Sequence, residues 1–180
     1  MAEEDIASFF DEAILERMRN DIKLGIKQGS HYLTALGLAS YTEYLGSIKG
    51  NRINEKGQTR HNYNVFLYDL NSEYRKIDEK LQSNKRDSLY RRIRCGLFHE
   101  YFIKKKAEIK PRSKHSQGIY YDEDKNKIVI SLCDYLNEFI NAVNELKKEC
   151  TENPPYELRK MARYWKFSNM SSGLNIIRDT

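Results

Sequence analysis

The spacing of apolar residues constrains the fold of this chain more than any other feature of its sequence. Over most of the 180 residues, apolar side chains recur at steps of three and four, the period of an amphipathic α-helix. The pattern predicts helices over about 5–28, 30–48, 63–82, 86–105 and 131–149, and a short basic helix after Pro154 and Pro155. Ser131 and Asp134 have the spacing of a capping box at the start of the fifth helix.

Two short segments have the composition of strands instead. Gly118–Asp122 and Lys127–Ser131 are rich in β-branched and aromatic residues, and a polar turn joins them. We therefore expect an all-α antiparallel helical bundle over residues 1–150, with a small β-hairpin near 118–131 inserted before the fifth helix. Residues 151–180 are expected to add a basic helix and a polar tail. The polar, glycine-containing segment 50–62 predicts a mobile loop.

Cysteine usage and the N-terminus predict a cytoplasmic protein. Cys95, Cys133 and Cys150 are odd in number and widely spaced, so we expect neither a disulfide framework nor a zinc site. The first residues are acidic where a secretory signal would be basic, and no apolar run reaches the roughly 18 residues that a membrane span needs. No cofactor and no metal are expected.

Positive charge is concentrated in the middle of the chain. Residues 86–115 contain ten Lys or Arg against three acidic residues, whereas the whole chain has a net charge of +5. A local field of this sign attracts polyanions, and RNA is the expected partner. The alternative is that Lys104, Lys105 and Lys106 only favour the C-terminus of a helix and keep the surface soluble.

One octapeptide, residues 94–101 (RCGLFHEY), combines proton-transfer and anion-binding groups within a predicted helix. The imidazole of His99 can move protons near neutral pH, and the guanidinium of Arg94 is a rigid fork of donors for phosphate. The two residues lie roughly 140° apart around a helix, so one helix alone makes a poor pocket. Two copies packed across a two-fold axis would bring both sets into a shared cleft, which predicts a homodimer through this helix.

The spacing Arg94-x4-His99, on a late helix of a helical bundle, resembles the R-x4-6-H signature of the HEPN family. Tyr101 extends the resemblance to R-x4-H-x-Y, the form of HEPN toxins whose partner nucleotidyltransferase antitoxins modify that tyrosine. The resemblance implies a metal-independent endoribonuclease, a hydrolase of the toxin–antitoxin or defence type, that leaves cyclic phosphate and 5′-hydroxyl ends.

The resemblance also implies roles for individual residues. Arg94 and His99 would be catalytic, and Glu100 and Tyr101 would be accessory or modified. The residues expected to bind phosphate or RNA are Arg91, Lys104, Lys105 and Lys106. Cys95 stands where active members commonly carry Asn, so the alternative is a non-catalytic HEPN-like module that binds a nucleotide or another protein. A third reading is a nucleic-acid-binding accessory protein that uses the three lysines and the terminal basic helix.

Overall fold

The long N-terminal helix predicted over 5–28 is confirmed. The computed structural model describes residues 2–83, 87–99 and 107–171. Here α1 (Ala2–Ser8), the wider π-helical turns of η1 (Phe9–Glu16) and α2 (Arg17–Lys27) follow one another without a break. Their apolar stripe, with Ile6, Phe10 and Met18 fully buried, faces the core. Gly29, at a φ of 76°, supplies the left-handed conformation that ends the helix.

The second helix is α3 (His31–Lys49), as predicted, and a glycine sets its distance from the next helix. A Cβ on Gly46 would lie 1.7 Å from the backbone oxygen of Asn62, at the start of α4 (Thr59–Leu70). Only glycine allows this approach, because any side chain would collide with backbone rather than with a movable group. The loop predicted over 50–62 is shorter than expected, because α4 already begins at Thr59.

The single helix predicted over 63–82 is wrong: the structure has α4 and then α5 (Glu73–Gln82). Asn71 breaks the helix, because its backbone is extended and its side-chain oxygen accepts the Glu73 amide at 3.0 Å. Short polar side chains favour such local bonds to backbone and so start a new helix. The apolar period continues across the break, and periodicity alone therefore missed it.

The predicted hairpin is confirmed, but it belongs to a three-stranded sheet. β2 (Ile119–Asp122) pairs antiparallel with β3 (Lys127–Ser131), and β1 (Ala107–Lys110) pairs parallel with the other edge of β3. Ile109 lies opposite Ile130 in the parallel pair. The sequence AEIK is too short and too charged to stand out as a strand, so β1 was not predicted.

The fifth helix, α7 (Leu132–Glu152), begins as predicted, although without the expected capping box. The Ser131 hydroxyl bonds to the side chain of Asp134 instead of to the helix backbone, and the Pro111 carbonyl accepts the Cys133 amide at 3.0 Å. α7 crosses the molecule, with Phe139 and Val143 fully buried.

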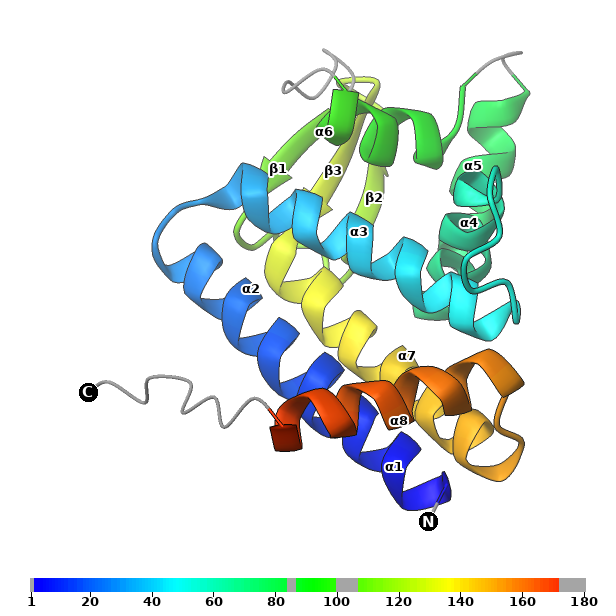
Figure 1. Cartoon of the computed structure of the whole chain (residues 1–180). Helices are drawn as coiled ribbons and strands as arrows, with labels where there is room; N and C mark the ends of the chain where they lie inside the picture. Colours follow the sequence, from blue (N-terminus) through cyan, green and yellow to red (C-terminus); the bar gives the residue numbers. More distant parts are fainter. Residues whose placement is uncertain (1, 84–86, 100–106, 172–180) are drawn as a thin grey trace.

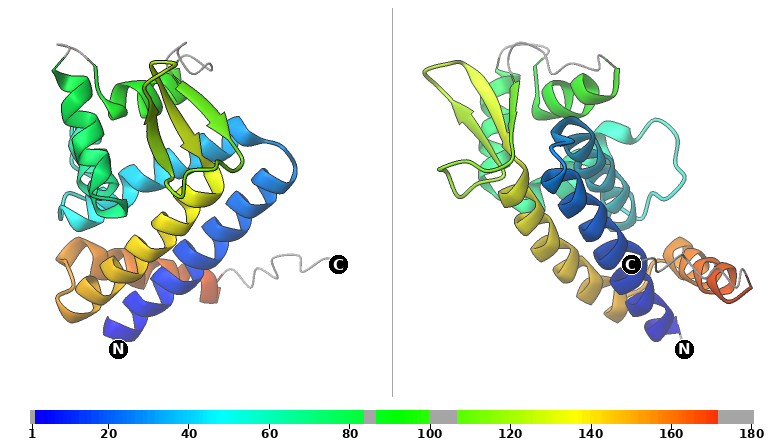
Figure 2. Two further views of the ribbon diagram at one scale, coloured as in Figure 1. Left: turned by 180° about the vertical axis from the view of Figure 1, so that it is seen from behind. Right: turned by 90° about the vertical axis from the view of Figure 1, so that its left-hand side faces the viewer.

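The basic terminal helix is also confirmed, as α8 (Tyr156–Ser171). It packs across α1 through the fully buried Leu158 and Ala162, which belong to the same core as the other helices. The molecule is thus mostly helical with a small sheet. The sheet lies at one end and α8 at the other (Figures 1 and 2). The domain boundary at residue 150 stays a prediction.

Candidate functional site

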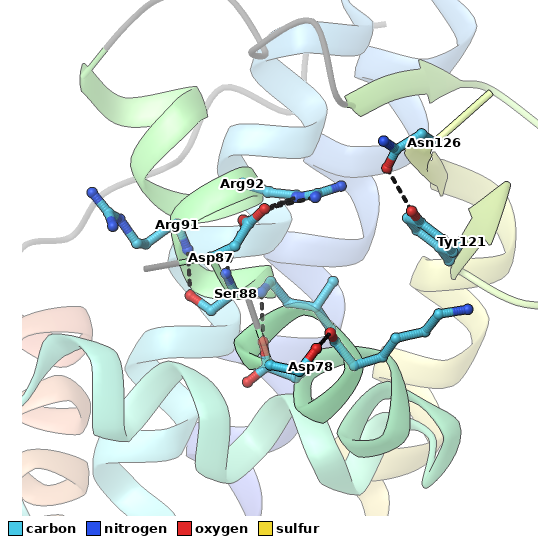
Figure 3. A network of polar contacts seen from close by, with 10 residues as sticks. Asp78, Asp87, Ser88, Arg91, Arg92, Tyr121 and Asn126 are labelled. Carbon is cyan, nitrogen blue, oxygen red and sulfur yellow. Dashed lines mark hydrogen bonds and ion pairs between the residues drawn. The ribbon is translucent and has the colours of Figure 1, made fainter. Parts of the chain in front are cut away.

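The helix that carries the motif is built from Leu89 through η2 (Tyr90–Cys95) and α6 (Gly96–His99), and polar side chains fix its start. Ser88 acts as the N-cap, because its hydroxyl accepts the Arg91 amide at 3.1 Å. The carboxylate of Asp78 on α5, which is completely buried, accepts the Leu89 amide at 2.6 Å (Figure 3).

Among the described residues, three donors bond to the carboxylate of Asp78. Besides Leu89, the Tyr68 hydroxyl and the Gln82 amide each donate to it at 2.6 Å. A buried carboxylate is tolerated only when its oxygens accept hydrogen bonds, and here those bonds join α4, α5 and the motif helix. Burial raises the pKa of the Tyr68 hydroxyl, and the hydrogen bond from this hydroxyl to the Asp78 carboxylate raises it further.

Arg92 has a structural role. Its side chain is buried, and its guanidinium donates to the Asp87 carboxylate, with Nη2 to Oδ2 at 2.6 Å. Arg91, the next residue back, is exposed, and its side chain points away from this ion pair (Figure 3). Of these two adjacent arginines, therefore, only Arg91 is placed to meet a ligand in solution.

Arg94 is held by two contacts. Its Nε donates to Oε2 of Glu43 on α3 at 2.6 Å, and the two side chains are only 14% and 22% exposed. Its guanidinium carbon lies 4.3 Å from the ring centroid of Phe98, one turn further along the helix. Phe98 is itself 56% exposed. The cation is consequently fixed in one orientation beside an aromatic ring at the surface.

Tyr90 and Cys95 complete the surroundings of this cation. Burial, followed by a hydrogen bond with Cys95, raises the pKa of the Tyr90 hydroxyl to about 12, although the nearby charge of Arg94 opposes this. The phenol is therefore neutral at physiological pH. Its ring also packs edge-on against Tyr63, at 5.7 Å between centroids, which ties the motif helix to α4.

The end of α6 is anchored to the start of α3. The Tyr32 hydroxyl donates to the backbone carbonyl of Leu97, and Leu97 is buried. His99 is the last residue of α6, and the structure describes its backbone but not its side chain. Whether His99 meets Arg94 thus stays a prediction. Glu100, Tyr101 and Lys104 to Lys106 lie outside the described residues.

The parts of the chain that the structure describes contain no group of three or more His, Cys, Asp or Glu side chains that could hold a metal ion. In the same residues no helix is both long and apolar enough to cross a bilayer.

Sequence reasoning missed Glu43 as a member of this site. The signal was present, because Glu43 is the only acidic residue in the nineteen of α3. A lone carboxylate among apolar and small residues on a buried helix usually has a cationic partner. Phe98 and Tyr90 gave no comparable signal, since aromatic residues at helical spacing are common in any core.

The chain matches no family model, no curated protein and no solved structure. The resemblance to the HEPN family therefore depends on the motif residues alone and stays a prediction.

Proposed function

We propose that this protein is an HEPN-like, RNA-binding endoribonuclease that works as a homodimer without a metal. The observation that carries the proposal is the fixed Arg94 guanidinium beside the exposed Phe98 ring, with His99 next in the chain. A cation next to an aromatic surface suits a nucleotide, because the cation attracts phosphate and the ring offers a face on which a base can stack.

The chemistry requires one acid–base group and one positive charge. His99 would take the proton of a ribose 2′-hydroxyl as its oxygen bonds to phosphorus. The bond from phosphorus to the 5′-oxygen then breaks, and an imidazolium returns a proton to that oxygen. The products are a cyclic phosphate and a 5′-hydroxyl. Arg94 would stabilise the charge that develops on the phosphoryl oxygens.

Glu43 would act as a positioning residue. It engages the Nε of Arg94 and so fixes the orientation of the guanidinium. Its negative charge also offsets part of the positive charge of Arg94, so attraction of RNA must come partly from the exposed Arg91 and from the central basic segment.

The test is cleavage of end-labelled RNA in EDTA by the parent protein and by Arg94→Ala and His99→Ala. We expect cleavage by the parent only, with a loss of at least roughly a hundredfold in each variant. Lys76→Ala is the control, because it removes an exposed lysine on α5 that pairs only with the neighbouring Glu73 among the described residues. Equal cleavage by all four proteins would trace the activity to a contaminant.

A non-catalytic HEPN-like interaction module is the second candidate, and the Arg94–Glu43 ion pair favours it. The pair is mostly covered within one chain, as expected for a residue that holds helices together. If this candidate is right, no RNA is cut by the parent or by any variant, although Arg94→Ala still lowers stability or dimerisation. Cleavage by the parent therefore separates the two candidates, and circular dichroism and sedimentation measurements on the same proteins report the structural role of Arg94.

A further inference from the structure

The outer face of α8 carries a regular stripe of aromatic and basic side chains. Its members recur at steps of one, three and four, and all six are exposed: Tyr156, Arg159, Lys160, Arg163, Tyr164 and Phe167. Together they line a shallow hollow of about 460 Å³. We call this surface the α8 stripe. It lies at the end of the molecule remote from the sheet and from the motif helix (Figure 1).

The aromatic members of the stripe are not part of the buried core. The opposite face of α8 already anchors the helix, through the buried Leu158 and Ala162 and through Trp165, which packs edge-on against Phe9 at 6.0 Å. Lys166 adds an ion pair to Asp5 of α1 at 2.5 Å. Tyr156, Tyr164 and Phe167, in contrast, are 67%, 65% and 69% exposed. Large aromatic rings this exposed indicate a surface that binds something.

The charges of the stripe limit the kind of ligand that it can bind. Three of its six residues are cations and none is acidic. Arg159 lies over the Tyr156 ring, at 5.9 Å from its centroid, so the cations and rings are interleaved along the helix. Such a surface offers attraction for a negative backbone and flat faces for stacking at the same place.

We propose that the α8 stripe binds single-stranded nucleic acid. Arg159, Lys160 and Arg163 contact phosphates, and bases stack on the exposed rings. The stripe spans about 17 Å along the helix axis, a length that accommodates a few nucleotides. Recognition is sequence-tolerant, because every base has a face for stacking, and either RNA or DNA can supply the shared chemistry.

Other occupants fit the stripe less well. A second copy of this chain docked across a two-fold axis would place the three cations against three identical cations, which repel. A helix that lies on a membrane separates its apolar face from its basic face, whereas here the rings alternate with the cations and the apolar face is packed inside the protein.

The experiment is fluorescence anisotropy with labelled oligo(U) and oligo(dT) of roughly ten nucleotides, beside a duplex of the same length. We expect the single strands to bind more tightly than the duplex. The logarithm of affinity should fall with the logarithm of salt concentration with a slope of about −2, as three phosphate contacts require. A preference for oligo(U) would identify RNA as the source, and equal affinities would identify single strands in general.

Paired variants separate stacking from charge. Tyr164→Ala should weaken binding by roughly tenfold, whereas Tyr164→Phe, which keeps the ring, should bind like the parent. Arg163→Ala should weaken binding and make the salt slope shallower by about 0.7. Lys23→Ala and Leu24→Ala are the matched controls, because both residues are exposed and lie on α2, outside the stripe. Neither should change the affinity.

The result that overturns the proposal is unchanged affinity in Tyr164→Ala and Arg163→Ala, or binding of the protein to phosphatidylserine vesicles in preference to the oligonucleotides. The proposal is independent of the function proposed for Arg94. A protein that binds oligonucleotide through α8 but cuts no RNA contradicts only the nuclease. One that cuts RNA equally well with Tyr164→Ala, and binds oligonucleotide as tightly, contradicts only the stripe.

Discussion

At the scale of single residues, Glu43 and Arg94 couple two helices through one ion pair. Because both side chains are mostly covered, removing either leaves a charge with poor access to water. We expect Glu43→Ala to lower the free energy of unfolding by about 1–3 kcal/mol, and a cycle with Arg94→Ala to show a coupling of about 1 kcal/mol. Urea denaturation of the four proteins measures both quantities.

The matched control for this pair is Glu145→Ala. Glu145 bonds to Lys148 at 2.7 Å, but both side chains are about two-thirds exposed, so no measurable loss is expected. A coupling near zero between Glu43 and Arg94 would contradict a fixed guanidinium, and with it the positioning role proposed for Glu43.

At the scale of elements, the start of the motif helix depends on the buried Asp78. Removing its carboxylate leaves three donors without their acceptor, including the Leu89 amide. We expect Asp78→Ala to lower the free energy of unfolding by about 2–4 kcal/mol, against about 1 kcal/mol for loss of the Ser88 cap in Ser88→Ala. Hydrogen exchange at Leu89 and Arg91 should accelerate in both variants.

Asp78→Asn is the sharper comparison, because it keeps the shape of the side chain while it removes the charge and replaces one acceptor oxygen by an NH2 donor. Its free energy of unfolding should lie between those of the parent and of Asp78→Ala. A loss as small as that of an exposed substitution would mean that the carboxylate does not organise this helix start.

The elements also show how far the sequence predicts this molecule. Helices with a long apolar stripe, such as α7, are evident from spacing, because burial of one face determines the spacing. The break at Asn71 and the strand β1 are not evident, since both depend on local hydrogen bonds or on pairing with a distant segment. The same reason explains the site: Arg94 is visible in the motif, whereas Glu43 lies 51 positions away and joins it only through the fold.

At the scale of the whole molecule, the buried tyrosines make the free energy of unfolding vary with pH in the alkaline range. Burial raises the pKa of the Tyr44 hydroxyl to about 12, whereas a tyrosine in an unfolded chain titrates near 10. Between these values the unfolded chain binds fewer protons than the folded one, so the free energy of unfolding falls as pH rises from about 10 to 12.

The variant that checks this is Tyr44→Phe, which cannot ionise. From about pH 10 to pH 12 its free energy of unfolding should fall by about 1–2 kcal/mol less than that of the parent. Urea denaturation at a series of pH values measures the difference. A variant whose stability falls as steeply as that of the parent would contradict the assignment to Tyr44.

Assembly is the property on which the proposed nuclease depends, and an apolar pair at one end of the molecule offers a place for it. Leu33 and Phe98 are 59% and 56% exposed. They lie at one junction, because Tyr32, which precedes Leu33, bonds to Leu97, which precedes Phe98. A partner that packs on Leu33 at this junction would bring the motif helices of two chains together, with the Phe98 rings facing the cleft between them.

We therefore expect the parent protein to sediment as a dimer and Leu33→Asp to sediment as a monomer, because a carboxylate cannot be buried in an apolar interface without a partner. Phe167→Asp is the control: it places the same charge at another exposed apolar residue, but on α8 at the opposite end of the molecule, and should remain a dimer. Leu33→Asp should also lose RNA cleavage while it still binds oligonucleotide through the α8 stripe. A parent protein that is monomeric at all concentrations, yet cuts RNA, would show that one motif helix is a sufficient site and that a shared cleft is unnecessary.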